Sequence, residues 1–258
     1  MPSPPRLPSP AAWAADLHLA GVFLTRLPLG SLMRAGTPAR AVRAYPVVGA
    51  AVGAAGGGTL LAAAALGLPA PAAAGLAVGV TILVTGALHE DGLADVADAC
   101  GPADRDQRLA VMRDSRVGTF GVLALVLSVL LRVAALAGPA PLVAAAGLAG
   151  AAGAARAGPA VLLHAMPPAR GDGLAAGVGR PDRETLGWAV GLGALALVLP
   201  AVAAGPTAAA AMALAVAAAT AGAGFLAHRL VGGLTGDTLG AGIQAAEITA
   251  LLALAGAA

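Results

Sequence analysis

Long apolar stretches recur along almost the whole chain, and they constrain the fold more than any other feature of the sequence. A helix needs roughly 20 residues to cross the hydrocarbon core of a bilayer, and most of these stretches reach about that length. The chain is only 11% charged, whereas a soluble domain has roughly 25% charged residues. The sequence therefore predicts an integral membrane protein. The predicted spans are residues 44–66, 71–88, 117–137, 142–163, 186–204, 207–227 and a shorter 243–256.

Small residues dominate the predicted spans. The chain has 37 glycines and only 2% aromatic residues, so its helices must pack in lipid through the close approach of Gly and Ala. The single Cys100 excludes an internal disulfide and a multi-cysteine metal site. We expect an all-α, polytopic membrane helix bundle with about seven transmembrane helices. Residues 11–258 would form a single integral-membrane catalytic domain.

The distribution of charge predicts how the chain crosses the membrane. The connections at 67–70, 138–141 and 205–206 are uncharged, whereas those at 89–116, 164–185 and 228–242 carry nearly all the charge outside the N-terminal segment. The positive-inside rule places the N-terminal segment and the three charged connections in the cytoplasm, with the C-terminus outside if the last span crosses.

The N-terminal segment divides into two parts. Residues 1–10 are rich in Pro and Ser, which is typical of a disordered tail. Residues 11–28 carry Trp13 and Phe23 but lack a clean apolar core, so we expect an amphipathic helix at the membrane interface.

An acidic cluster at 89–98 follows the second predicted span. On a helix, Asp91, Asp95 and Asp98 share one face within roughly 60°. Like charges on one face repel each other unless a counter-ion binds, and a divalent metal with oxygen ligands would be suitable. The alternative is a solvated helix end. His89 directly precedes this stripe and is a candidate general base.

The segment 112–121 leads into the third predicted span. Arg113, Ser115 and Arg116 stand at a helix N-terminus with glycines beside them, a combination that suits phosphate oxygens. Asp114 would either extend the metal site or pair with an arginine. The alternative interpretation of the segment is a cytoplasmic anchor that follows the positive-inside rule.

A glycine-rich turn is predicted at 232–240, with Thr235, Gly236 and Asp237 as candidate site residues. Glycines let a backbone approach a ligand closely, although an ordinary turn between two helices looks similar.

Three charged residues fall inside the predicted spans, where charges are costly. Arg156 and Glu247 could face the site, whereas Arg132, nearer the outer end of its span, would snorkel or pair structurally.

Carboxylates for Mg²⁺, arginines for phosphate and an apolar body together suit phosphoryl transfer to or from an amphiphilic substrate. Two alternatives compete. A CDP-alcohol-type lipid phosphotransferase would carry an Ala-Arg after its second Asp-Gly, which is missing here. A transporter would spread polar residues through the depth of its spans, but here they gather at one face.

Five segments of the chain, in the same order, resemble the cobalamin synthase family, the adenosylcobinamide-GDP ribazoletransferases of vitamin B12 biosynthesis, and the resemblance runs from about residue 20 to about residue 252. They are FLTRLP at 23–28, YPVVG at 45–49, HEDGLAD at 89–95, MRDSRVGT at 112–119 and TGDTLGA at 235–241. Glu90 and Ala99 depart from the family pattern, which often has an apolar residue and a glycine there. Neither departure removes a proposed ligand.

The resemblance implies a Mg²⁺-dependent multi-pass enzyme of the bacterial cytoplasmic membrane, with its active site on the cytoplasmic face. A ribose hydroxyl of α-ribazole, or of its 5′-phosphate, would attack the phosphorus next to the cobinamide of adenosylcobinamide-GDP, and GMP would leave. We expect the lipid bilayer as a partner and no nucleic acid, and a homo-oligomer is compatible with the sequence.

On this reading each candidate residue has an expected role. The metal ligands would be Asp91, Asp95, Asp98 and Asp114; the catalytic groups Asp237, His89 and Asp98; and the substrate-binding residues Arg113, Ser115, Arg116, Arg156, Thr235 and Gly236. The sequence leaves open whether Asp237 or His89 is the general base.

Overall fold

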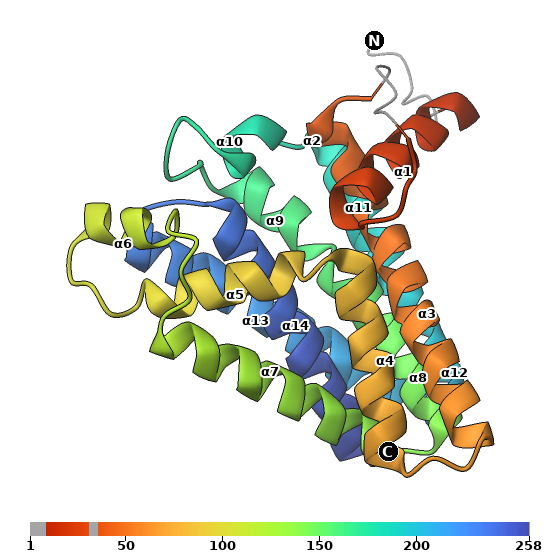
Figure 1. Ribbon diagram of the computed structural model, residues 1–258. Coiled ribbons are helices and arrows are strands. Elements are labelled where there is room, and N and C mark those ends of the chain that lie inside the picture. Colours follow the sequence, from red (N-terminus) through yellow and green to blue (C-terminus); the bar gives the residue numbers. More distant parts are fainter. Residues whose placement is uncertain (1–8, 31–35, 258) are drawn as a thin grey trace.

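The structure is a computed structural model that describes residues 9–30 and 36–257. Helices account for every regular element in these ranges (Figure 1). Most of the predicted tail, residues 1–8, lies outside the described residues, and the first helix begins at Pro10. The elements are α1 Pro10–Leu24, α2 Pro38–Ala41, the 3-10 helix η1 Val42–Ala44, α3 Tyr45–Ala65, α4 Ala70–Thr85, α5 Leu88–Asp98, α6 Arg105–Val111, α7 Thr119–Ala137, α8 Pro141–Ala155, α9 Gly158–Ala165, α10 Leu174–Val178, α11 Arg183–Ala196, α12 Val198–Ala204, α13 Pro206–Val231 and α14 Gly236–Ala257.

The helices include the predicted membrane spans. Within residues 9–30 and 36–257, six helical stretches are long and apolar enough to cross a bilayer: Pro38–Ala65, Thr119–Ala137, Pro141–Ala165, Arg183–Ala204, Pro206–Val231 and Gly236–Ala257. A seventh candidate consists of α4 and α5, which pass the same test together but meet at a bend of 91°. The predicted all-α bundle of about seven spans is therefore confirmed.

The last span differs from its prediction. A short span at 243–256 is wrong, because α14 begins at Gly236 and has 22 residues. A capping box starts it early: the N–H of Thr238 donates to Oγ1 of Thr235 at 3.1 Å, and the N–H of Thr235 donates to Oγ1 of Thr238 at 2.9 Å. Most of the predicted loop at 228–242 is consequently helical. Its glycines and its carboxylate lower the local hydropathy without ending the helix.

Helix α1 packs on α2, η1 and α3. Its two large aromatic residues contact other aromatic side chains of the protein. Trp13 meets Trp188 edge-on, with ring centroids 5.3 Å apart, and Phe23 stacks on Tyr45 at 5.8 Å. The placement of α1 at the membrane interface stays a prediction.

Helices α3 and α8 approach each other closely through glycines spaced four residues apart. A Cβ atom at Gly49 would lie 2.4 Å from the carbonyl oxygen of Ala152, and one at Gly53 would lie 2.5 Å from that of Leu148. Such a contact requires glycine, and small residues at this spacing are typical of helix pairs in lipid. The glycine content therefore determines how near these two backbones come.

Replacing Gly53 by alanine is expected to destabilise the protein by about 1–3 kcal/mol, because the new Cβ must push α3 away from α8. Thermal unfolding in detergent would measure the effect. Gly58→Ala is the matched control: it lies on the same helix, a Cβ there would meet nothing within 4 Å, and alanine favours the helix by up to about 1 kcal/mol. Equal midpoints for the two variants would contradict the proposed packing.

One face of α7 is apolar and exposed, whereas the other is buried. Phe120, Leu123, Leu127 and Leu130 follow helical spacing on the exposed face. The buried face carries Arg132. This pattern is expected of a helix that presents one face to lipid and the other to the helix bundle.

Figure 1 shows the C-terminus at the same end of the bundle as the connection between α3 and α4, with α1, α2 and α10 at the opposite end. This arrangement agrees with the predicted grouping of uncharged turns at one end and charged segments at the other.

Candidate active site

The acidic helix α5 leaves the direction of α4 through two consecutive left-handed residues. Gly86 has φ +64° and Ala87 has φ +58°, and the N–H of Ala87 donates to the carbonyl of Ile82 at 3.0 Å. A non-glycine residue in this region is uncommon, so the turn is strongly specified by its surroundings. The turn directs α5 across the bundle, where it packs on α7 and α14.

Helix α5 touches the start of α14 at Gly92. A Cβ there would lie 2.8 Å from the carbonyl oxygen of Asp237, so glycine permits the contact. The close approach brings the carboxylates of two separate motifs together. Asp95 lies within electrostatic range of both Asp91 and Asp237.

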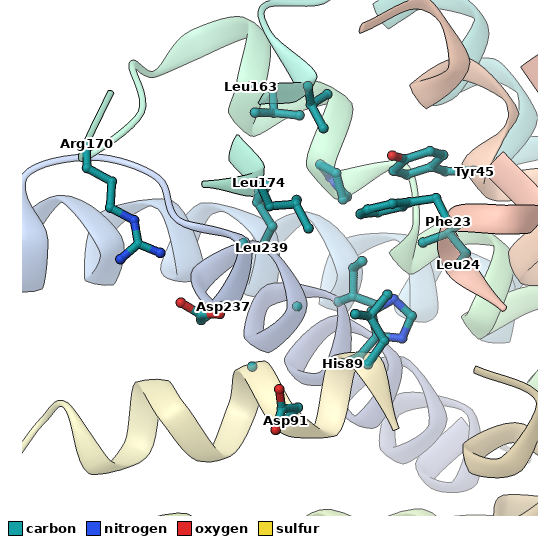
Figure 2. A pocket seen from close by; sticks show the side chains of 17 residues that line it. Phe23, Leu24, Tyr45, His89, Asp91, Leu163, Arg170, Leu174, Asp237 and Leu239 are labelled. Atoms are coloured by element: carbon teal, nitrogen blue, oxygen red, sulfur yellow. The ribbon is translucent and has the colours of Figure 1, made fainter. Parts of the chain in front are cut away.

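A pocket opens between α5 and α14, with further walls from α1, α3, α9 and α10. Figure 2 shows the carboxylates of Asp91 and Asp237 and the guanidinium of Arg170 pointing into the same space. The other side of the pocket is mainly apolar, and its labelled side chains are Phe23, Leu24, Tyr45, Leu163 and Leu174. The pocket therefore offers a charged wall and an apolar wall to one ligand.

Asp237 stands in the first turn of α14, between the two threonines of the capping box. Its Oδ2 atom is buried and has no hydrogen-bond partner in residues 9–30 and 36–257. A buried carboxylate oxygen without a partner is costly. This atom therefore has an unused capacity to bind a cation or accept a proton from a ligand.

Arg170 is the cationic side chain of the pocket, and the sequence reading did not single it out. Its loop is tied to the segment before α14 by two backbone hydrogen bonds. The N–H of Ala169 donates to the carbonyl of Leu234 at 2.8 Å, and the N–H of Leu234 donates to that of Pro167 at 3.0 Å. A Cβ at Gly233 would lie 2.8 Å from the nitrogen of Ala169, so this glycine admits a neighbouring backbone.

This clamp places the Arg170 side chain within electrostatic range of Asp237. Its Nη1 atom is buried and has no hydrogen-bond partner within the described parts of the chain. The only sequence signal for Arg170 was a charged residue in the glycine-containing stretch Arg170-Gly171-Asp172-Gly173.

Asp98 is engaged elsewhere on the same acidic helix. Its Oδ2 accepts the N–H of Gly118 at 2.7 Å, and its Oδ1 accepts the N–H of Gly121 at 2.8 Å. A Cβ at Gly118 would lie 2.5 Å from an Asp98 oxygen, and a Cβ at Gly121 would lie 2.4 Å from one. The carboxylate thus satisfies the free N–H groups at the start of α7. Asp98 does not line the pocket.

The arginines of 112–121 lie outside the pocket. Arg116 is 88% exposed and binds Asp114, and its hydrogen bonds lower the pKa of Asp114 to about 2. Arg113 pairs with Asp172 at 2.8 Å, and both side chains are exposed. Ser115 is also exposed. Of the two roles expected for Asp114, the geometry favours the pair with an arginine.

Thr235 and Arg156 are buried and do not line the pocket. Thr235 is buried in the capping box of α14, whereas its neighbour Gly236 lines the pocket. Arg156 is buried and binds Glu247 at 3.4 Å. Arg132 forms a structural pair, because it contacts Glu90 at 3.0 Å and is only 1% exposed.

The pocket carries carboxylate oxygens, the type of ligand that Mg²⁺ prefers. Among residues 9–30 and 36–257, no three His, Cys, Asp or Glu side chains are grouped closely enough to hold a metal ion. Mg²⁺ usually binds through one or two carboxylates together with water and substrate phosphates. Asp91 and Asp237, with Asp95 nearby, supply such oxygen donors. The residues therefore fit a Mg²⁺ ion that is bound partly by these carboxylates and partly by the phosphate of a substrate.

Comparison with known proteins gives this arrangement a context. Residues 16–255 match the family described as cobalamin-5-phosphate synthase. The chain belongs to this family. A relative from Allorhizobium ampelinum, named adenosylcobinamide-GDP ribazoletransferase, is 44% identical, and the match covers 95% of this chain and 97% of the relative. A relative of the same name from Bradyrhizobium diazoefficiens is 46% identical over 93% of each chain. No solved structure matches the chain.

Family membership makes the role of Asp98 testable by turnover. Asp98→Asn is expected to lower the free energy of unfolding by about 1–2 kcal/mol, because the amide keeps one acceptor for two N–H groups. Turnover of the folded fraction is expected to stay within about threefold of wild type, since the substitution affects only the cap of α7. A loss of about 100-fold or more at unchanged stability would instead identify Asp98 as a member of the reactive site.

Proposed function

We propose that the protein is a Mg²⁺-dependent adenosylcobinamide-GDP ribazoletransferase. A ribose hydroxyl of α-ribazole, or of its 5′-phosphate, attacks the phosphorus next to the cobinamide. The new P–O bond forms as the bond to the bridging oxygen of the pyrophosphate breaks, and GMP departs with that oxygen. The products are adenosylcobalamin, or its 5′-phosphate, and GMP, while the hydroxyl proton passes to a base.

The pocket between α5 and α14 is the observation that carries this proposal. Two carboxylates and one guanidinium face an apolar wall there (Figure 2). Substrates that join a charged pyrophosphate to a large organic group need both surfaces at once. Transfer of a phosphoryl group depends mainly on positioning and on charge neutralisation, which these side chains can provide.

Four charged residues at or beside the pocket have a proposed role. Asp91, Asp237 and Asp95 would hold Mg²⁺, which when bound neutralises the negative charge of the pyrophosphate. The Arg170 guanidinium binds phosphate oxygens of the donor, because its planar fork matches them. The carboxylate of Asp237 accepts the proton of the attacking hydroxyl through Oδ2, which has no partner in residues 9–30 and 36–257.

The proposed location is the bacterial cytoplasmic membrane, with the pocket open to the cytoplasm. The positions of the charged connections support this orientation. The apolar wall, which includes Phe23 and Leu163, would hold part of the corrinoid donor while the ribazole acceptor enters from water.

The two competing functions receive no support from the comparisons. The relatives carry the ribazoletransferase name over almost their full length. Arg132 and Arg156, which fall inside the predicted spans, each form a buried ion pair with Glu247, whereas a transporter needs polar groups that line a path.

Reconstitution in liposomes tests the proposed function directly. Purified protein, adenosylcobinamide-GDP and α-ribazole should release GMP in the presence of Mg²⁺, and excess EDTA should reduce the rate by about 100-fold or more. Parallel reactions with a CDP-activated lipid donor should give no transfer. Folded protein that releases no GMP, or that acts only on the CDP donor, would refute the proposal.

A further inference from the structure

His89 lines the pocket, and the residue is only 2% exposed. Its Nε2 atom is buried and finds no hydrogen-bond partner in residues 9–30 and 36–257. Figure 2 shows the ring close to the apolar wall, on the side of the pocket away from Arg170. A buried ring nitrogen without a partner at the edge of a pocket is available to a ligand.

The other ring nitrogen shows where the proton of His89 resides. Nδ1 lies 3.5 Å from Nη2 of Arg156. A guanidinium has five donors and no acceptor, so Nδ1 must be the acceptor in this contact. The neutral ring then carries its hydrogen on Nε2. His89, which lines the pocket, therefore carries an N–H donor without a partner in the described residues, whereas a general base needs a free acceptor.

Arg156 is held rigidly in the position that makes this contact. Its Nη1 donates to the carbonyl of Ala152 at 2.8 Å and to Oε2 of Glu247 at 3.4 Å. A Cβ at Gly49 would lie 2.5 Å from Cδ of Arg156, so a glycine on α3 makes room for the side chain. The guanidinium thus has few alternative positions.

Glu247 also connects Arg156 to a second buried pair. Its Oε1 lies 3.7 Å from Nη1 of Arg132, and Arg132 binds Glu90 at 3.0 Å. Glu90 is the chain neighbour of His89. Two arginines and two glutamates balance each other in this cluster, as buried charges must in order to persist. This cluster of ion pairs links α5, α7, α14 and the end of α8.

We propose that Arg156, fixed by Glu247, is a positioning residue that holds the His89 ring so that its Nε2–H donates a hydrogen bond to a phosphate oxygen of the donor substrate. This inference rests on the proposed function. It makes His89 a stabiliser of charge on the phosphoryl group and leaves proton acceptance to Asp237. Arg156 then contributes to catalysis through His89 and does not touch the substrate.

Replacing His89 by glutamine or by asparagine distinguishes its possible roles, because the two side chains place their amide groups differently. The side-chain NH₂ of glutamine reaches the position of Nε2, whereas that of asparagine reaches only the position of Nδ1. His89→Gln is expected to keep kcat within about tenfold of wild type, while His89→Asn and His89→Ala each lose about 100-fold. If His89 accepts a proton, all three variants lose activity equally. If the ring only supports Arg156, Asn outperforms Gln. Either of these results overturns the proposal.

A double-mutant cycle tests the role of Arg156. Arg156→Gln combined with Glu247→Gln keeps the charge of the cluster balanced, so this pair serves as the background. The pair is expected to lower kcat about 100-fold without raising KM for the donor, and adding His89→Ala should cost less than about twofold more. Losses that multiply would show that Arg156 acts independently of His89 and would overturn the proposal.

Folding and function remain separable in these experiments. If the Arg156 and Glu247 pair fails to give a monodisperse protein in detergent, the His89 variants still decide the matter, because they leave every ion pair intact. Wild-type protein without GMP release would refute the proposed function. Wild-type turnover with equal losses in His89→Gln and His89→Ala would refute only this inference.

Discussion

Asp237→Asn is expected to lower kcat for GMP release by about 1,000-fold with little change in stability. The Oδ2 atom of Asp237 is buried without a partner among the described residues and faces the pocket beside Asp91. Asparagine preserves the shape of the side chain but can neither accept a proton nor supply a negative charge to a cation. Steady-state kinetics in liposomes at saturating Mg²⁺ would measure the loss.

Asp106→Asn is the matched control, because the Asp106 side chain is 87% exposed and its ion pair is with its neighbour Arg105 at the surface. It should behave like wild type. Thermal unfolding of both variants shows whether they are equally folded. An Asp237→Asn enzyme that turns over within about tenfold of wild type would exclude this carboxylate as base and as ligand.

Arg170→Ala is expected to lower kcat/KM for the corrinoid donor by about 100-fold or more. The guanidinium is the positive group that Figure 2 shows in the pocket, and its Nη1 atom has no partner in the described chain. The backbone clamp between Ala169 and Leu234 does not involve this side chain, so the loop should keep its place in the variant. The loss would then report contacts with the phosphates.

Arg113→Ala gives the comparison that separates pocket from surface. Both arginines interact with Asp172, but the Arg113 side chain is 55% exposed and lies outside the pocket. Removing an exposed ion pair usually costs less than about 1 kcal/mol, so Arg113→Ala should stay within about threefold of wild type. Equal losses for the two variants would mean that phosphate binding is not localised at Arg170.

The acidic helix illustrates both the reach and the limit of sequence reasoning. Spacing alone places Asp91, Asp95 and Asp98 on one helical face. It does not reveal that Asp98 finds two N–H groups of α7, because Gly118 and Gly121 are more than 19 residues further along the chain. Three equivalent carboxylates in the sequence thus become two kinds of carboxylate in the structure.

The arginines show the same limit of sequence reasoning. Arg113 and Arg116 stand in a conspicuous motif, yet they pair with acidic residues at the surface. Arg170 stands in an inconspicuous loop, yet a backbone clamp brings it to the pocket. Residue type and spacing cannot distinguish these cases, since the difference lies in which segments meet.

The sequence by itself determined that the chain is a membrane helix bundle of about seven spans and that charge gathers at one end. The bilayer leaves few alternatives to such a fold, because the backbone polar groups of each span must be hydrogen-bonded within a helix and charges must be paired or excluded. The family motifs could also be read along the chain.

Only the tertiary structure decided which charged side chains share one pocket. The left-handed turn at Gly86 and Ala87 directs α5 across the bundle, and Gly92 lets it touch the start of α14. These contacts join residues nearly 150 positions apart, as Asp91 and Asp237 are. Local periodicity carries no information about such contacts, since they depend on how closely particular backbones can approach.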